Sequence, residues 1–487
     1  MRDDEIRTRL RENNPWWQAV ASERDPIAWA TADRSLVARQ KFDLGYRSNL
    51  LHDVAAGEID DKLVILRGPR RVGKSVLLKD TALALCARSD IDPRQLIYVA
   101  LDGMTIADLR RVLRLGRELT RSMGDERRIW LLDEVTALKG WTAELKYQRD
   151  NTHFGNDTVV CTGSSWEGTS NVERDLLAGR SGERSERRSR VLHPMSFREV
   201  LVATNRLDPT SEKISPWELQ TPATRRIAES LESFVDELDL AWQSYLTSGG
   251  FPRSVAENHN SGGVSDSFLE DLAAWLHRDV DPDAHDDSVP RLLSAIEQHC
   301  SSPLSRNSLS QELGYADGNG LDVRLNRLTH AYAALWCHQI DINGDRIRGS
   351  QSKMYLADPL LSWIGPRLRS GLPSPDFTRL TEAALATALA RAVDDLQRGR
   401  WESQDAIGYL RTGGGKEIDF SRVPIPSPAG VKQSVPLESK WVSSGWRAEA
   451  RSIEGYFSSG VLATRTILDT RYLAWALPAP IVALLLE

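Results

Sequence analysis

The stretch LVILRGPRRVGKS, residues 63–75, decides the fold of the first half of this chain. Its apolar start, Leu63–Leu66, predicts a buried strand, and the apolar spacing over Val76–Arg88 predicts an amphipathic helix. Between them, Gly68–Ser75 matches the pattern GxxxxGK followed by Ser or Thr. Glycines at these places let backbone N–H groups and the helix N-terminus face a bound anion. The stretch therefore predicts a nucleotide-phosphate site.

We expect this loop to bind ATP together with Mg²⁺. Lys74 would neutralise the β- and γ-phosphates, and the Ser75 hydroxyl would complete the coordination of Mg²⁺. The residues predicted to contact the nucleotide are Gly68, Pro69, Arg70, Arg71, Val72, Gly73, Lys74, Ser75 and Val76.

Further strands alternate with helices downstream. Short β-branched runs at Leu96–Leu101, Ile129–Leu132 and Thr158–Cys161 predict strands, and Ile106–Arg121 predicts a helix. This alternation is typical of a parallel sheet covered on both faces. The predicted fold class is a multidomain α/β protein with a P-loop parallel-sheet core.

Polar residues follow two of these strands. Asp133 is expected to hold Mg²⁺ through water, and Glu134 to polarise the attacking water. The last of the strands is followed by small hydroxyl residues, one of which could sense the γ-phosphate and orient the water. Ser164 is favoured for that role, and Thr162 and Ser165 stay open.

An arginine cluster follows at Arg180–Arg190, with five Arg and two Glu. One interpretation is an arginine finger that contacts the γ-phosphate, with Arg180 and Arg184 as the first candidates. The other is an exposed loop of solvated ion pairs, which contribute little stability. The sequence does not separate the two.

Composition limits the class of protein. A length of 487 residues predicts about three domains. The net charge of −6 excludes a uniformly basic nucleic-acid binder. The four cysteines form no CxxC pair, which is typical of a reducing cytosol. No signal peptide or membrane-spanning run is recognisable, so we expect a cytoplasmic protein without membrane contact.

The chain is expected to divide into five parts. Their predicted bounds are 1–45 for an N-terminal arm, 46–200 for the P-loop core, 201–288 for a helical lid, 289–370 for a winged helix, and 371–487 for a final α/β module. Three helices followed by the strand pair Trp336–Ile342 and Lys353–Leu356 favour the winged helix. Arg324 and Arg327 on its candidate recognition helix could reach DNA phosphates or pack within the chain.

Several motifs together resemble a group of prokaryotic AAA-like P-loop ATPases fused to a C-terminal domain of unknown function with a nuclease-like fold. They are NPWW at 14–17, GPRRVGKS at 68–75, LLDEV at 131–135, CTGSS at 161–165, LAGRSGER at 177–184, HPMSFRE at 193–199, YLTSGGFP at 245–252 and KMYLADP at 353–359. The resemblance spans nearly the whole chain. It implies an ATPase core, a helical lid, a winged helix and a restriction-endonuclease-like end.

The final module carries carboxylates in a suggestive order. Asp419, the ExK run from Glu438 to Lys440 and the upstream helical Glu382 resemble the PD-(D/E)XK nucleases. That resemblance implies that Asp419 and Glu438 hold Mg²⁺, that Glu382 completes the metal shell, and that Lys440 orients water. Residues two apart on a strand share a face, so Glu438 and Lys440 should converge. The alternative is a surface Glu–Lys pair beside an unrelated Asp.

The expected function is ATP hydrolysis coupled to a Mg²⁺-dependent, nuclease-like domain acting on DNA, in genome maintenance or antiphage defence. DNA would be bound through the winged helix and the C-terminal domain, and the chain could form a homo-oligomer. The competing hypothesis is a nucleotide-switched regulatory or sensor ATPase whose C-terminal domain binds a partner and cuts nothing.

Overall fold

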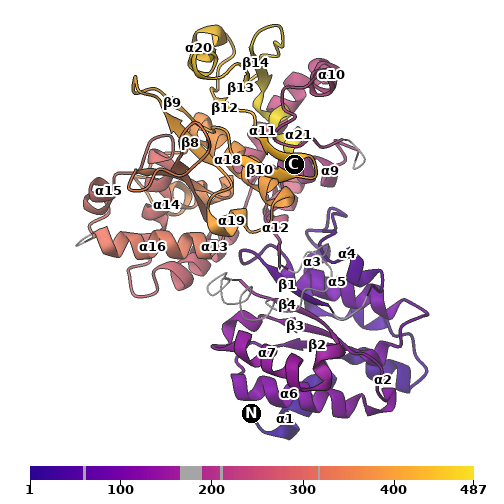
Figure 1. Cartoon of the computed structure of the whole chain (residues 1–487). Helices are drawn as coiled ribbons and strands as arrows, with labels where there is room; N and C mark the ends of the chain where they lie inside the picture. Colours follow the sequence, from indigo (N-terminus) through magenta and orange to yellow (C-terminus); the bar gives the residue numbers. More distant parts are fainter. Residues whose placement is uncertain (59–61, 165–188, 209–211, 316–317) are drawn as a thin grey trace. The chain divides into compact units, whose positions relative to one another are not determined.

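The computed structural model describes residues 1–58, 62–164, 189–208, 212–315 and 318–487 (Figure 1). The chain forms two compact units, Met1–His193 and Pro194–Glu487. The finer division into five parts stays a prediction.

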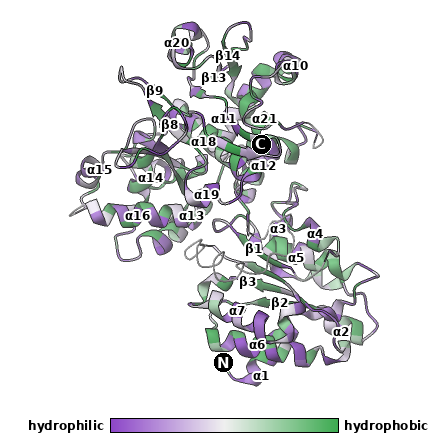
Figure 2. Ribbon diagram, viewed as in Figure 1, coloured by the Kyte–Doolittle hydropathy of each residue, from purple (hydrophilic) through white to green (hydrophobic). Residues whose placement is uncertain are grey.

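The first unit is built on a five-stranded sheet in the order β2-β3-β4-β1-β5, in which every pair is parallel. The strands are β1 (Leu63–Arg67), β2 (Leu96–Ala100), β3 (Ile129–Asp133), β4 (Thr158–Thr162) and β5 (Ser189–Val191). Strands β1, β2 and β3 are largely hydrophobic (Figure 2). The predicted parallel-sheet core is confirmed, with four predicted strands ending within one residue of their observed ends.

Helices α1 and α6 contribute to one apolar core with this sheet. Alternate strand residues such as Ile97, Val99, Trp130 and Leu132 lie in that core with apolar side chains of the two helices. The helices of the first unit are α1 (Asp3–Asn13), α2 (Pro15–Ala21), η1 (Ala28–Thr31), α3 (Arg34–Gln40), α4 (His52–Ala55), α5 (Lys74–Cys86), η2 (Pro93–Gln95), α6 (Ile106–Leu119), η3 (Arg121–Met123), η4 (Val135–Ala137), α7 (Trp141–Asn151) and η5 (His153–Asn156).

The edge strand β2 is capped by side chains of the N-terminal arm. Asn14, buried between α1 and α2, accepts a hydrogen bond from the Tyr98 N–H at 2.6 Å and donates one to the Tyr98 carbonyl at 2.8 Å. The indoles of Trp16 and Trp17 both donate to the Leu96 carbonyl, at 3.1 and 2.9 Å. An exposed strand edge offers unpaired backbone groups to other chains. The NPWW run therefore takes the place of a neighbouring strand.

The far end of the same edge is capped in the same way. Asn13 accepts from the Ala100 N–H at 3.1 Å, and Arg9 donates to the carbonyls of Ala100 and Asp102 at 2.7 and 2.9 Å. The N-terminal arm is thus held to the sheet by specific hydrogen bonds to backbone groups as well as by apolar packing.

The second unit is mainly helical. Its helices are α9 (Phe197–Ala203), α10 (Pro222–Ser230), η7 (Glu232–Phe234), α11 (Val235–Ser248), α12 (Pro252–Ser261), α13 (Asp266–Val280), α14 (Ser288–His299), α15 (Arg306–Glu312), α16 (Gly318–His330), α17 (Pro359–Leu368), α18 (Phe377–Leu396), α19 (Arg400–Ser403), α20 (Trp446–Tyr456) and α21 (Ala479–Leu486). Within the described ranges, no helix is both long and apolar enough to cross a bilayer.

Two sheets of this unit place its candidate residues. A four-stranded sheet has the order β7-β6-β8-β9, and a three-stranded parallel sheet has the order β12-β13-β14. An antiparallel bridge from Phe420 to Leu437 joins the end of β9 to β12. The strands are β6 (Ala334–Gln339), β7 (Ser352–Leu356), β8 (Gly408–Arg411), β9 (Glu417–Ile418), β10 (Pro424–Ser427), β11 (Gly430–Gln433), β12 (Leu437–Ser439), β13 (Gly460–Thr464) and β14 (Ala474–Pro478).

The hairpin expected to be the wing of a winged helix does not end its sheet. Its strand β6 pairs in parallel with β8 of the final module, with His338 opposite Gly408 and Gln339 opposite Tyr409. A side chain at Gly408 would lie 2.6 Å from a methyl group of Ile340, so the close approach of these strands requires glycine. One sheet therefore crosses the predicted boundary at 370.

The strand that carries the ExK run is short. It spans Leu437–Ser439, and Glu438 is in its middle. Pro436 lacks an N–H and cannot donate to a strand ladder, so regular pairing begins after it.

We predict that Asn14→Ala lowers the free energy of unfolding of the first unit by about 2–4 kcal/mol, because the buried N–H and carbonyl of Tyr98 lose their partners. Urea titration with hydrogen–deuterium exchange of β2 and β3 peptides measures this unit separately. The matched variant Asn13→Ala removes one bond at a half-buried side chain and should cost about 1 kcal/mol. Equal costs for the two variants would contradict the edge-capping role of Asn14.

Candidate functional site

The phosphate loop connects β1 to α5. Two of its residues, Gly68 and Gly73, have backbone conformations that residues with a side chain rarely adopt. Gly68 has φ +140°, and a Cβ there would lie 2.1 Å from the Leu192 carbonyl oxygen. Gly73 has φ +99° and immediately precedes α5, with nothing within 4 Å of where its Cβ would be. The N-cap residue of α5 is Gly73, which has no side chain to bond to the first N–H groups of the helix. The N-terminus of a helix whose first N–H groups have no such cap is a common binding site for an anion.

Lys74 is buried as the first residue of α5. Its ammonium donates to the carbonyls of Gly68 and Pro69 at 3.0 and 2.8 Å. The predicted helix start at Val76 is two residues late, so Lys74, Ser75 and Val76 all belong to the first turn of the helix. Both loop arginines, Arg70 and Arg71, are more exposed than the buried Val72 that follows them.

Asp133, the last residue of β3, is held by two hydroxyl groups. Thr162, at the end of β4, donates to Oδ1 at 2.5 Å, and Tyr98 of β2 donates to Oδ2 at 2.9 Å. Burial and the Asp133 charge raise the pKa of Tyr98, so the phenol stays a donor. Asp133 is therefore a fixed carboxylate at the carboxyl end of the sheet.

Glu134 follows with a left-handed backbone, φ +57°. Its N–H donates to Thr162 at 2.9 Å, and the Ser164 hydroxyl lies 2.9 and 2.8 Å from its two carboxylate oxygens. A left-handed conformation is strained for a residue with a side chain and marks candidate functional positions. Of the three hydroxyl candidates, Ser164 contacts Glu134, Thr162 contacts Asp133, and Ser165 lies outside the described residues, as do Arg180 and Arg184.

The C-terminal candidates converge in the second unit. The Asp419 N–H donates to Glu438 at 3.1 Å, and the Ser439 N–H donates to Asp419 at 3.0 Å. The Lys440 ammonium lies 2.8 Å from Glu438 and 3.9 Å from Asp419. The expected shared face of Glu438 and Lys440 is thus present in the structure.

Lys353 of β7 enters the same cluster and was not among the predicted site residues. Its ammonium lies 2.8 Å from Asp419, 3.3 Å from Glu382 and 3.7 Å from Glu417. The Tyr355 hydroxyl, two residues on, donates to Glu382 at 2.7 Å. The motif KMYLADP is part of the family resemblance, which implies no role for its lysine. A lysine inside an apolar strand was the available signal, because such a residue requires buried partners.

The charges of this cluster depend on burial and on the two lysines. Burial and the neighbouring Asp419 raise the pKa of Glu438 to about 8. Burial also raises the pKa of Glu382. Burial opposes ionisation of Asp419, but Lys353 and Lys440 hold its pKa below the usual value. Asp419 and Glu382 keep the pKa of Lys353 above its usual value against the effect of burial. Lys353 and Asp419 thus form an ion pair.

These residues do not fit a Mg²⁺ site as they stand. Oxygens of Glu382, Asp419 and Glu438 accept from ammonium, hydroxyl or backbone N–H groups. Among the described residues, no group of three or more His, Cys, Asp or Glu side chains is arranged to hold a metal ion.

The arginines of the candidate recognition helix are engaged inside the unit. Arg324 of α16 lies 2.7 Å from Asp281 and stacks over the Tyr315 ring, and Arg327 donates to the Val280 carbonyl at 3.0 Å. Of the two interpretations, intramolecular packing is the one these contacts favour.

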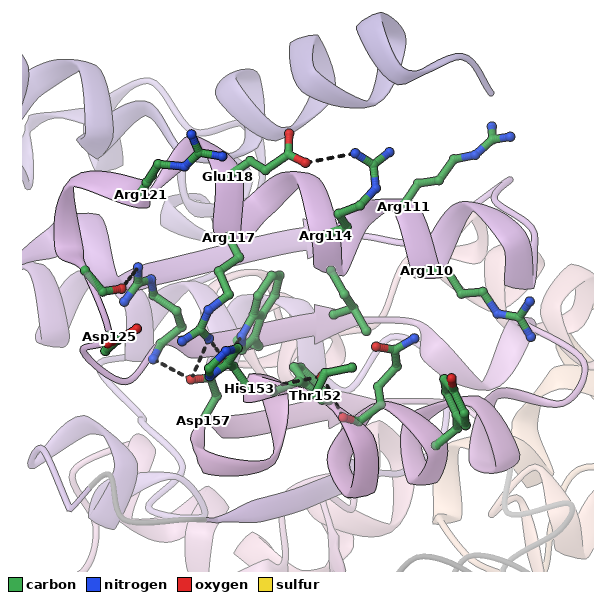
Figure 3. Close-up of a pocket in the computed structure, with 17 residues that line it drawn as sticks. Arg110, Arg111, Arg114, Arg117, Glu118, Arg121, Asp125, Thr152, His153 and Asp157 are labelled. Carbon is green, nitrogen blue, oxygen red and sulfur yellow. Dashed lines mark hydrogen bonds and ion pairs between the residues drawn. The ribbon is translucent and has the colours of Figure 1, made fainter.

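A separate pocket of about 820 Å³ lies in the first unit beside the amino ends of β3 and β4 (Figure 3). Arg117 of α6 points toward Asp157, 3.0 Å away, and Asp157 also accepts from the Arg128 N–H and the Trp130 indole. The pocket lies at the end of the strands opposite Asp133, so it is not part of the nucleotide site.

Residues 60–201 match the family model described as an AAA domain. No curated protein matches the chain. Among solved structures, the chain is similar to the Walker-type ATPase PABY2304 of Pyrococcus abyssi, with 16% identity and a TM-score of 0.37 over 67% of this chain and 96% of that one. It is similar to the Aeropyrum pernix ORC2 protein in ADPNP-ADP complexes, with 13% identity and a TM-score of 0.33 over 68% and 97%. It is also similar to a Thermotoga maritima RuvB variant, with 17% identity and a TM-score of 0.27 over 61% and 87%.

The matched segment contains the loop Gly68–Ser75, the carboxylates Asp133 and Glu134, and the hydroxyls Thr162 and Ser164. The strand that carries these hydroxyls, β4, lies between β1 and β3 in the sheet. Residues 60–201 of the chain therefore match an AAA domain, and they contain a phosphate loop between a strand and a helix of a parallel sheet, as P-loop proteins do.

Proposed function

We propose that the first unit hydrolyses ATP at the carboxyl ends of β1, β3 and β4. The observation that carries this is the pairing of Ser164 with both carboxylate oxygens of Glu134, from a strand that lies between the phosphate loop and Asp133. Glu134 would take the proton of the attacking water. Ser164 would contact the γ-phosphate and would orient the Glu134 carboxylate according to whether that phosphate is present. Lys74 would exchange the carbonyls of Gly68 and Pro69 for phosphate oxygens.

Ser75 and Asp133 have the oxygen ligands that Mg²⁺ prefers, and they are the residues that would hold it. The bound ion supplies charge neutralisation of the phosphates. The Asp133 carboxylate is already held in place for this role, because the hydroxyl groups of Thr162 and Tyr98 donate hydrogen bonds to its two oxygens. The finger role of Arg180 or Arg184, and homo-oligomerisation, stay predictions.

We expect Lys74→Ala to abolish ATP turnover by removing the charge on the phosphates. Glu134→Gln should lower kcat by about 10²-fold or more, the usual contribution of a general base, and keep ATP binding. Phosphate release and binding of a fluorescent ATP analogue measure the two effects. Unchanged turnover in either variant would refute the assignment.

The two hydroxyl residues have separable predicted effects. Ser164→Ala should lower kcat with little change in KM, because Ser164 contacts Glu134 alone among the two carboxylates. Thr162→Val should also raise the Mg²⁺ concentration that turnover requires, because Thr162 holds the Asp133 carboxylate in place. A steady-state titration of ATP and Mg²⁺ distinguishes them, and identical profiles would contradict the division of roles.

The ATPase cycle is proposed to act on the second unit, in genome maintenance or antiphage defence. The order α18, β8, β9, β12, α20, β13 supports a restriction-endonuclease-like architecture, because Glu382, Asp419, Glu438 and Lys440 meet at its centre. Mg²⁺-dependent cleavage of DNA is one function of such a domain. The Lys353 ammonium between Asp419 and Glu382 favours the other, in which the domain binds a partner and regulates.

A cleavage assay decides between the two. Single-stranded, duplex and branched DNA are incubated with the full chain, ATP and Mg²⁺ or Mn²⁺, with Asp419→Ala as control. We expect no product above the level of the control. A product that Asp419→Ala removes would establish cleavage and refute the regulatory function.

A further inference from the structure

We propose that the ammonium of Lys353 is the resident cation of the C-terminal carboxylate cluster and stands in the position of a divalent metal. This inference concerns the same cluster as the proposed nuclease-like architecture and rests on it. Lys353 is supplied by β7, outside the Asp…ExK pattern, and reaches the cluster because β7, β6, β8 and β9 form one sheet.

The first argument is the direction of the carboxylate oxygens. Asp419 Oδ1 accepts from Lys353, and Asp419 Oδ2 accepts from the Ser439 N–H. Glu438 Oε1 faces Lys440, and Glu438 Oε2 accepts from the Asp419 N–H. All four oxygens of Asp419 and Glu438, two of the three predicted metal ligands, thus face hydrogen-bond donors. A Mg²⁺ site would require several of them to face a common point.

The second argument is position. The Lys353 ammonium bridges Asp419 Oδ1 and Glu382 Oε1, which belong to two of the three carboxylates expected around a metal. A Mg²⁺ at about 2.1 Å from Asp419 Oδ1 would lie within about 5 Å of this ammonium. Two cations at that separation in a buried site repel strongly. A metal ion on Asp419 Oδ1 would therefore compete with the Lys353 ammonium for the same oxygen.

The third argument is burial. The Lys353 side chain is 0% exposed, and those of Glu382 and Asp419 are 6% and 8% exposed. A buried ammonium persists only with close ionic partners, and its removal leaves uncompensated negative charge. Tyr355 adds a hydrogen bond to Glu382 from the same strand. The strand β7 therefore supplies both the cation and a hydroxyl donor to the carboxylate cluster.

The test is a Mn²⁺ titration of the full chain without nucleotide, followed by electron paramagnetic resonance. We expect wild type and Asp419→Asn to bind Mn²⁺ identically, because the C-terminal cluster takes none. Lys353→Met, which keeps length and removes charge, should gain a Mn²⁺ site at least about ten-fold tighter than any in wild type. That site should vanish in Lys353→Met combined with Asp419→Asn. Lys353→Arg, which keeps the cation, should gain none.

Two outcomes overturn the inference. One is a Mn²⁺ ion bound by wild type and lost in Asp419→Asn. The other is a Lys353→Met protein with native circular dichroism that gains no Mn²⁺ site. If Lys353→Met fails to fold, the comparison of wild type with Asp419→Asn decides alone. Neither outcome bears on the ATPase proposal. That proposal is tested by the ATP turnover of Lys74→Ala, which does not involve Mn²⁺ at Asp419.

Discussion

The first unit depends on a parallel sheet that brings the carboxyl ends of β1, β3 and β4 to the same side of the sheet. Parallel strands all end on the same side, so the loop after β1, the carboxylates after β3 and the hydroxyls after β4 must be neighbours. The hydrogen bonds from Thr162 to Asp133 and from Ser164 to Glu134 follow from this order, because β4 lies between the other two strands. The same order leaves β2 at an edge. Its backbone groups are paired by Asn14, Trp16 and Trp17, so the arm that precedes the domain also completes its sheet.

Local patterns carried most of the fold prediction for this unit. The loop Gly68–Ser75, the strand ending at Asp133 and the strand ending at Thr162 are each recognisable because their chemistry is encoded in adjacent residues. Their helix and strand ends shift by one or two residues, as at Lys74, because hydrogen bonding and not hydrophobicity sets an element's first residue. The hydrogen bonds of Asn14 to Tyr98 were not predictable, since they depend on which strand is left at the edge. Only tertiary pairing specifies that.

The C-terminal cluster shows the same limit more sharply. Glu438 and Lys440 share a strand, so their convergence follows from a two-residue period. Lys353 is separated from Asp419 by 66 residues and meets it only because β6 pairs with β8. No spacing rule relates the two residues. The domain boundary expected at residue 370 had assigned them to different modules, and the continuous sheet is what unites them.

This union changes what the carboxylates can do. A lysine buried without partners would lose its proton or unfold its surroundings, and carboxylates buried together would repel one another. The buried lysine and the buried carboxylates therefore stabilise one another. Removing one partner of such a pair costs about 3–5 kcal/mol of folding free energy. A metal ion could also neutralise the carboxylates, but it would exchange with the solvent. The Lys353 ammonium, in contrast, is tethered to β7 and stays beside the carboxylates. The cation that balances Asp419 and Glu382 is thus part of the fold itself, supplied by the strand that carries Lys353.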